Sequence, residues 1–291
     1  MMSFDLNIFL GIVYLAAIYI AITIVYALVV TDFFMRVWKS KQISGMKRVL
    51  LVTAHPDDEC MFFGPTIVAL AKNPDVRIYV LCLSLGDYEG MGNLRKLELW
   101  HSCKKLGVNE SNITCLNYQH LRDNPKVLWQ SSHMAKAILH HVHMLDINTL
   151  ITFDGYGVSG HTNHISIYNC IAELMHTRAI PPKCRVFSLE SVSWFRKYIL
   201  GVFDVYFSYV TSTFMYVTNE VGRSVIRSAM EVHVTQYVWY RKLYMVFSRY
   251  INVNTFREIP HKKLHDANAA AGRRRKFPLF RNNSQSRQKN E

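Results

Sequence analysis

The chain has 291 residues, which is enough for one large domain or two small ones, so disorder throughout is excluded. Half of the residues are apolar, 19% are charged, and the formal net charge is +13. Residues 257–291 carry much of that charge, with ten Lys and Arg against three Asp and Glu. The six cysteines show no CxxC spacing and lie in core-like sequence. They predict buried thiols and argue against a disulfide scaffold.

The first element is an uncharged stretch of 23 residues, 8–30. As a helix it reaches roughly 34 Å, enough to cross a hydrocarbon core of about 30 Å. Because no basic region precedes it, an uncleaved transmembrane anchor is favoured over a cleaved signal peptide or a buried core helix. Five basic residues follow by position 48. The positive-inside rule then predicts a single span with residues 1–7 in the lumen and the body in the cytosol.

After a basic linker, 31–46, five short apolar runs end in polar residues, a pattern typical of strands buried on both faces. Segments with helical spacing separate them, as in successive βαβ units. The sequence therefore predicts an α/β domain over 47–256, with a Rossmann-like, mostly parallel sheet and helices on both faces. No G-x-G-x-x-G follows the first strand, which argues against a bound dinucleotide. The predicted strands are 47–54, 76–84, 113–118, 149–154 and 185–189.

Apolar spacing also predicts which face of each helix is buried. The expected faces are Leu94, Leu97, Cys103 and Leu106 on the first helix, Met134, Ala137, Ile138 and Leu145 on the second, and Ile165, Tyr168, Ile171, Ala172 and Met175 on the third.

Two aromatic-rich segments follow the last predicted strand. Residues 198–219 include an aspartate and several Ser and Thr, so an interfacial or core element is favoured over a second membrane span. Residues 234–251 interleave Arg241, Lys242 and Arg249 with aromatic residues. That mixture suits either a membrane surface or an amphipathic helix that covers the sheet.

The closing stretch, 257–291, is polar and low in complexity, which predicts a disordered basic tail. Its RRRK run is similar to a nuclear signal, but next to a membrane anchor weak attraction to lipid or to ribosomes is favoured. We expect no nucleic-acid partner.

A cluster of potential ligands ends the first predicted strand, in AHPDDE. His55, Asp57, Asp58 and Glu59 offer one imidazole and three carboxylates within five residues, which suits a divalent metal with a carboxylate left over as general base. In an open parallel sheet, ligands bind beyond the carboxyl ends of the strands, where this cluster falls. The alternative is that Asp57 or Asp58 only caps the next helix.

A second cluster, GHTNH, follows the fourth predicted strand. His161 and His164 share one helix face at a spacing of three residues, so both rings can point into one cavity. A catalytic zinc needs three protein ligands and an open position for water. A His, an Asp and a His from the two clusters meet that count and leave a carboxylate and an imidazole as base and acid.

The motifs AHPDDE, SLGDYEG with NLRKLEL, and GHTNH together resemble the LmbE-like family of zinc-dependent de-N-acetylases, over about residues 47–256. The resemblance implies hydrolysis of an N-acetyl group, with Zn²⁺ or another divalent metal as cofactor. It implies that His55, Asp58 and His164 bind the metal, that Asp57 is the general base, that His161 stabilises the oxyanion and protonates the leaving amine, and that Arg95 contacts the substrate. Glu59, Asp87 and Asp154 match family positions and are expected only to support the ligands.

With the N-terminal anchor and the WYRKLYMVFSRYI segment, the chain resembles the eukaryotic membrane branch of that family. The implied substrate is the glycolipid N-acetylglucosaminyl-phosphatidylinositol in the endoplasmic reticulum membrane, reached from the cytosolic side. The implied products are glucosaminyl-phosphatidylinositol and acetate, the second step of glycosylphosphatidylinositol (GPI) anchor synthesis. Two alternatives are a de-N-acetylase for another GlcNAc conjugate and a non-enzymatic membrane-tethered scaffold. The scaffold explains the charge but not the His and Asp residues at two strand ends.

Overall fold

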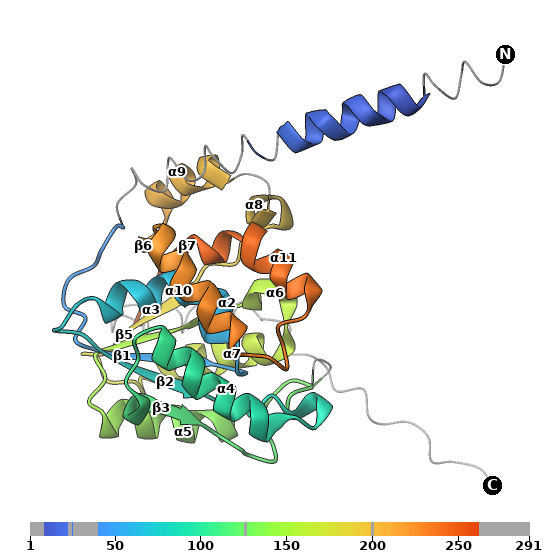
Figure 1. The fold of residues 1–291 in the computed structure, drawn as a ribbon. Helices are drawn as coiled ribbons and strands as arrows, with labels where there is room; N and C mark the ends of the chain where they lie inside the picture. Colours follow the sequence, from blue (N-terminus) through green and yellow to red (C-terminus); the bar gives the residue numbers. More distant parts are fainter. Residues whose placement is uncertain (1–8, 23–24, 26–39, 125–126, 199–200, 262–291) are drawn as a thin grey trace, which may run out of the picture.

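The computed structural model describes residues 9–22, 25, 40–124, 127–198 and 201–261. Its body is one seven-stranded sheet between two layers of helices (Figure 1). The strands are β1 (Arg48–Thr53), β2 (Arg77–Cys82), β3 (Ile113–Cys115), β4 (Thr149–Phe153), β5 (Arg185–Leu189), β6 (Phe214–Val217) and β7 (Val253–Ile259). The helices are α2 (Asp58–Phe62), α3 (Gly64–Ala71), α4 (Gly92–Lys105), α5 (Ser131–Met144), α6 (Gly157–Gly160), α7 (Thr162–His176), α8 (Trp194–Tyr198), α9 (Gly201–Thr211), α10 (Glu220–Glu231) and α11 (Trp239–Phe247), with the 3₁₀ turns η1 (Asp87–Glu89), η2 (Glu110–Asn112) and η3 (Arg249–Ile251).

The strands follow the spatial order β3-β2-β1-β4-β5-β7-β6. Strands β1 to β5 are parallel, and β7 and β6 extend the sheet as antiparallel strands. The predicted mostly parallel α/β sheet and its five strands are confirmed. The sequence did not predict β6, a four-residue strand within an aromatic-rich segment. It also did not predict β7, which continues past the predicted domain end at 256. Residues 257–259, expected to begin the disordered tail, pair with β5.

Both faces of the sheet are buried, as the continuous apolar runs predicted. Along β1, Val49 and Leu51 point into a core that includes residues of α2, α3, α4 and α10. Leu50 and Val52 point into a second core with α5 and α7. Successive strand side chains alternate between faces, so a strand covered on both sides must be apolar at every position.

Two of the three predicted helix faces are only partly right. Cys103 and Leu106 at the end of α4 and Ile171 and Met175 on α7 are buried as predicted, but the buried faces also include residues that were not predicted. On α4, Leu94 and Leu97 are 56% and 58% exposed, whereas Arg95 and Ser102 are buried. On α7 the buried face includes His164. In both helices polar side chains that serve the strand-end site occupy the inner face, so apolar spacing misled the prediction. The face of α5 is confirmed at Met134, Ala137 and Ile138, which are buried, with Leu145 partly buried just beyond the helix.

The two aromatic-rich segments form α8, α9, β6, α11 and η3. The idea that the cations of 234–251 face lipid is wrong for two of the three. Arg249 is buried and pairs with Asp204, and Arg241 pairs with Asp57. Only Lys242 is exposed.

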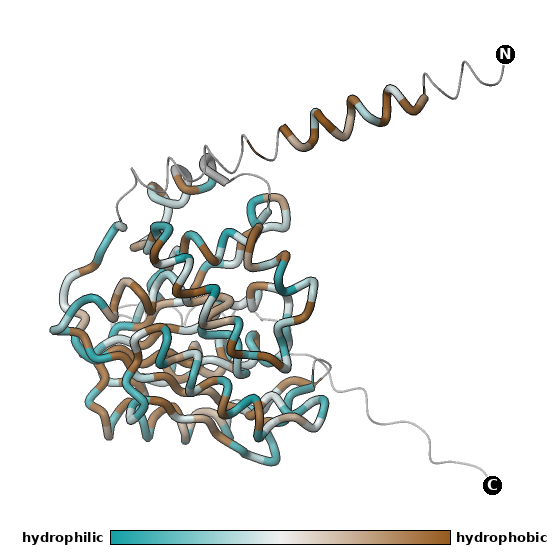
Figure 2. The backbone as a smooth tube through the Cα atoms, viewed as in Figure 1, coloured by the Kyte–Doolittle hydropathy of each residue, from teal (hydrophilic) through white to brown (hydrophobic). Residues whose placement is uncertain are grey.

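At the N-terminus, residues 9–22 are helical and their apolar side chains are exposed; Figure 2 shows this helix as mostly hydrophobic. No helix among the described residues is both long and apolar enough to cross a membrane. The predicted span 8–30 includes positions outside the described residues, as does the tail from 262. All six cysteines are free, as predicted.

Candidate metal and catalytic site

The site lies where the strand order changes direction. From β1 the chain adds β2 and β3 on one side, then returns to place β4 on the other side. The loops that leave β1 and β4 therefore diverge and open a crevice beyond their carboxyl ends. His55 to Glu59 follow β1, and His161 and His164 follow β4.

The loop after β1 is held by the Asp58 carboxylate. Its Oδ2 accepts the backbone N–H groups of Ala54 and His55, each at 2.9 Å. Its Oδ1 lies 3.2 Å from Nε2 of His164. Asp57 stands at the N-cap position of α2 but makes no capping hydrogen bond, and its φ of 104° is left-handed. The helix-cap alternative therefore fails for both aspartates, and the strain at Asp57 marks a constrained position.

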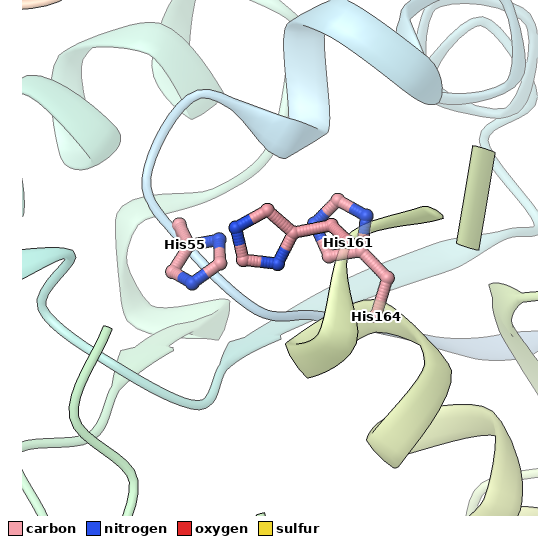
Figure 3. Close-up of side chains that lie close together, drawn as sticks. All are labelled: His55, His161 and His164. Carbon is pink, nitrogen blue, oxygen red and sulfur yellow. The ribbon is translucent and has the colours of Figure 1, made fainter. Parts of the chain in front are cut away.

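Helix α7 brings in the other two imidazoles. His161 is its N-cap residue, and Nδ1 accepts the N–H of Asn163 at 3.3 Å. A neutral His161 ring therefore carries its proton on Nε2. His164 lies one turn later, with Nδ1 positioned to donate to the carbonyl of Gly157 at 3.1 Å. Figure 3 shows both rings grouped with His55; the His161 ring centroid lies 4.8 Å from that of His55 and 4.9 Å from that of His164.

The electrostatics of the cluster favour an ionised carboxylate among imidazoles. Burial alone would raise the pKa of Asp58, but His164 and His55 outweigh it and hold that pKa well below its usual range. Burial alone would lower the pKa of His164, but Asp58 outweighs it and raises that pKa. Burial and the two neighbouring imidazoles lower the pKa of His161 to about 4, so this ring is neutral at pH 7.

These donors fit a divalent cation. Nε2 of His164 is buried and lies 3.2 Å from Oδ1 of Asp58, but it makes no well-aligned hydrogen bond to any described residue. A buried polar atom without a partner is costly, and a metal ion would satisfy it. Ligand atoms of His55, His161 and His164 lie within 4.8 Å of one another, and Asp58 touches this group. The structure thus offers four donors where the sequence prediction used His55, Asp58 and His164. Imidazole with carboxylate suits zinc.

The general-base candidate, Asp57, faces two guanidinium groups. Arg95 from α4 lies 3.4 Å from Oδ2 of Asp57, and Arg241 from α11 pairs with the same oxygen. Arg95 also donates to the carbonyls of Gly86 and Pro56, each at 2.7 Å. Gly86 has a φ of +67°, and a Cβ there would lie 2.5 Å from Cζ of Arg95, which explains the glycine in SLGDYEG.

Two of the supporting carboxylates, those of Glu59 and Asp154, accept backbone hydrogen bonds that fix the loops of the site. Glu59 is fully buried, and Oε2 accepts the backbone N–H of Asp57 at 3.0 Å. Asp154 accepts the N–H groups of Gly157 and Ser191 and so fixes the turn whose carbonyl orients His164. This is the outer support that ligand geometry requires.

Asp87 supports the start of α4, where Oδ1 accepts the N–H of Gly92 at 2.6 Å. It therefore acts on the helix that carries Arg95, as expected of a residue outside the ligand group.

Four residues of the site were not predicted. Asp123 lies 3.2 Å from Nε2 of His55, and Asn163 lies 3.0 Å from the same atom. Arg241 pairs with Asp57, and His233 pairs with Glu59 at 2.7 Å. Of these, Asn163 stood inside the motif GHTNH, and Arg241 stood inside WYRKLYMVFSRYI but was not predicted to reach the site. The others lie in segments without a pattern of their own.

The site opens into a cavity of about 950 Å³. Its lining includes His55, Asp57, Asp58, His161 and His164, which we call the reaction end, and mostly aromatic residues of α8 and α11, which we call the arm. Those residues are Trp194, Tyr198, Tyr240, Tyr244 and Phe247, together with Lys197 and Leu243. The cavity therefore joins a polar reaction end to an apolar arm.

Among solved structures, the chain is similar in fold to N,N'-diacetylchitobiose deacetylase from Pyrococcus horikoshii. The TM-score is 0.55 at 17% identity, and the match covers 74% of this chain and 84% of that one. This likeness supports the α/β fold alone. Residues 50–175 match the family model described as PIG-L, GlcNAc-PI de-N-acetylase.

Sequence relatives extend the match beyond that segment. The chain is 39% identical over 212 residues to N-acetylglucosaminyl-phosphatidylinositol de-N-acetylase of Bos taurus, covering 72% of this chain and 83% of the relative. It is 35% identical over 227 residues to the probable enzyme of that name from Schizosaccharomyces pombe, covering 73% and 87%. The chain belongs to the GlcNAc-PI de-N-acetylase family.

Proposed function

We propose that this protein removes the N-acetyl group of N-acetylglucosaminyl-phosphatidylinositol, giving glucosaminyl-phosphatidylinositol and acetate, the second step of GPI-anchor synthesis. The single observation that carries the proposal is the cavity, because its lining combines a metal-type donor cluster, Asp57 and His161 with an aromatic arm. Relatives of this family carry the same activity in their names.

The protein's own residues divide the work of amide hydrolysis. A zinc ion held by His55, Asp58 and His164 would supply a water of lowered pKa and polarise the acetamide carbonyl. Asp57, fixed by its backbone N–H on Glu59, accepts the proton of the attacking water. His161, with its proton on Nε2, donates a hydrogen bond to the developing oxyanion. The C–N bond then breaks, and the leaving nitrogen takes up the proton that Asp57 accepted from the water.

A glycolipid fits the apolar arm better than a soluble GlcNAc conjugate does. The arm presents the rings of Tyr240, Tyr244 and Phe247, which offer an extended apolar surface for the lipid portion of a glycolipid. The arm therefore favours a substrate with an apolar portion. The scaffold alternative gives no reason for a cluster of donors in a cavity.

The decisive test is hydrolysis of acetyl-labelled GlcNAc-phosphatidylinositol by the full chain purified in detergent. Released labelled acetate is expected, abolished by a chelator and restored by Zn²⁺. His164→Ala is the inactive control, and acetyl-labelled diacetylchitobiose is the matched soluble substrate. Release from the soluble sugar but not from the glycolipid would assign the activity to another GlcNAc conjugate. Absence of both metal and acetate release would favour the scaffold.

We also propose that the protein is anchored in the endoplasmic reticulum membrane by one span over residues 8–30, with the catalytic body in the cytosol. The uncharged stretch is long enough, and the side chains of helix 9–22 are exposed and apolar. Exposed Trp239 and Leu243 on α11, beside the cavity arm, suit contact with the same membrane. Protease added to sealed microsomes is expected to digest the body. Glycosylation at Asn112 in the native chain would contradict this orientation.

A further inference from the structure

Three cations line the cavity, and they differ in their partners. Arg95 and Arg241 both contact the carboxylate of Asp57. Lys197, at the end of α8, lines the arm of the same cavity. Among the ion pairs of the described residues, none joins Lys197 to a carboxylate. Its positive charge is therefore the one that the cavity does not neutralise internally.

The ammonium of Lys197 lies among three tyrosine rings. Nζ is 5.3 Å from the ring centroid of Tyr198, 4.9 Å from that of Tyr244 and 5.6 Å from that of Tyr250. Aromatic faces stabilise a cation without cancelling its charge. Burial lowers the pKa of Lys197 to about 8, so the group remains mostly protonated at neutral pH. The rings thus keep a partly desolvated cation in place.

Two of these rings are fixed in position. The hydroxyl of Tyr250 donates to the carbonyl of Glu190 and accepts the N–H of Val192, both at 3.1 Å. The hydroxyl of Tyr244 lies 3.2 Å from the carbonyl of Met61, to which it donates. A preorganised cation of this kind loses little side-chain entropy when an anion binds.

The position of Lys197 relative to the reaction end is set by a row of rings. Tyr244 packs against Phe62 with centroids 6.1 Å apart, and Phe62 packs against His164 at 5.7 Å. One ring therefore separates Tyr244 from the metal-type cluster. A ligand whose acetamide lies at His164 and whose anion lies at Lys197 must be extended along the cavity, with its apolar portion continuing into the arm.

We propose that Lys197 binds the phosphodiester anion of the glycolipid substrate, a proposal that rests on the function proposed above. The phosphodiester is the only charged group that links the sugar to the lipid of such a substrate, and it lies between its acetamide and its apolar chains. Lys197 lines the same cavity as the reaction end, with the rings of Tyr244 and Phe62 between it and His164. The residue would therefore make the enzyme specific for a phosphate-bearing substrate.

The test compares two substrates and three variants of the full chain in detergent. The substrates are a short-chain GlcNAc-phosphatidylinositol and GlcNAc-inositol, which lacks the phosphate. Lys197→Met is expected to lower kcat/KM for the phosphate-bearing substrate about 10- to 100-fold, mainly through KM, and to leave GlcNAc-inositol unchanged. Lys197→Arg is expected to retain most of the activity. Lys96→Met is the matched control, because Lys96 also stands over an aromatic ring, Trp100 at 5.5 Å, but outside the cavity.

An equal loss on both substrates in Lys197→Met would overturn the proposal and indicate a packing role; so would no loss on either. Binding of glycerophosphoinositol, measured by calorimetry, separates this proposal from the activity. If the wild-type chain hydrolyses neither substrate yet binds glycerophosphoinositol in a way that Lys197→Met abolishes, the anion site stands and the proposed function falls. Binding that Lys197→Met leaves unchanged would overturn the anion site itself.

Discussion

Among the described residues, two clusters have the composition of a metal site, and they differ in whether the cavity reaches them. One comprises His55, His161 and His164, and the other comprises Glu59, Cys60 and His233. In the first, Nε2 of His164 makes no well-aligned hydrogen bond to any described residue, and the cavity reaches the group. We call the second the rear cluster. None of its three residues lines the cavity.

Most polar atoms of the rear cluster have partners, but Nδ1 of His233, like Nε2 of His164, makes no hydrogen bond among the described residues and lies 3.9 Å from Oε2 of Glu98. Glu59 accepts from His233 and Ser102 and from the backbone of Asp57. Burial alone would raise the pKa of Glu59 and lower that of His233, but their mutual attraction outweighs it and shifts both the other way. Proximity of ligand-type residues is thus a poor criterion for a metal site. Each cluster has an imidazole nitrogen without a hydrogen-bond partner, so it is access to the cavity that distinguishes the first cluster from the second.

The largest expected effect tests the first cluster directly. His164→Ala and Asp58→Ala should each remove most bound metal and nearly all activity, because each deletes one of three protein ligands. The check is metal content by mass spectrometry together with labelled acetate release.

His161→Ala is the matched comparison within that cluster. It should keep the metal and lose rate, because the family resemblance makes His161 a catalytic group. If His161→Ala loses the metal while Asp58→Ala retains it, the three-histidine set binds the ion and the ligand assignment must be redrawn.

Asp57→Asn should have the next largest effect. A general base typically contributes roughly 10²- to 10⁴-fold, so kcat should fall by about that factor with nearly unchanged metal content. The reason is that proton transfer matters only in the transition state. Metal content and kcat are measured on the same preparation. Loss of metal in Asp57→Asn would place Asp57 among the ligands instead.

Disruption of the rear cluster should act mainly on stability. Glu59→Ala leaves His233 buried without its partner, which typically costs about 3 to 5 kcal/mol and would lower the Tm by roughly 6 to 20 °C. Thermal unfolding of the full chain in detergent measures it. Glu110→Ala is the control, because Glu110 pairs with Lys104 on the surface at 2.6 Å, and no measurable loss is expected. A Tm of Glu59→Ala equal to wild type would contradict the account of the rear cluster.

The stability difference between wild type and Glu59→Ala should also depend on pH. The lowered pKa of Glu59 gives stability that is present above about pH 4.3 and lost as the pH falls through the folded-state pKa. The raised pKa of His233 gives stability that is fully present below about pH 6.5 and lost as the pH rises through its folded-state pKa. The difference in Tm should therefore be largest between about pH 4.5 and 6.5. A difference that keeps growing above pH 9 would contradict the pairing.

The sequence predicted the parts of the site that follow local rules. His55 to Asp58 and His161 to His164 each stand after a buried strand, and parallel strands bring their carboxyl ends to one edge. Residues that reach the site from distant parts of the sequence could not be predicted from their position after a strand. Arg241 meets Asp57 across 184 residues and His233 meets Glu59 across 174, and neither stands in a periodic pattern. The polar inner face of α4 was missed for the same reason, since its burial depends on Glu59 and His233 rather than on apolar spacing.

The smallest expected effect concerns Cys60, the thiol of the rear cluster. Burial raises the pKa of Cys60 well above its usual value, and the nearby carboxylates of Glu59 and Asp57 raise it further. The group is therefore a neutral thiol, which is a poor metal ligand, and it lies 3.2 Å from the carbonyl of Asp57, to which it donates. Cys60→Ala should keep a full equivalent of metal and remain active, with a modest loss of stability from the lost packing. The check is the metal content of Cys60→Ala and of His164→Ala, measured side by side. If Cys60→Ala loses the metal and His164→Ala keeps it, the metal binds at the rear cluster instead.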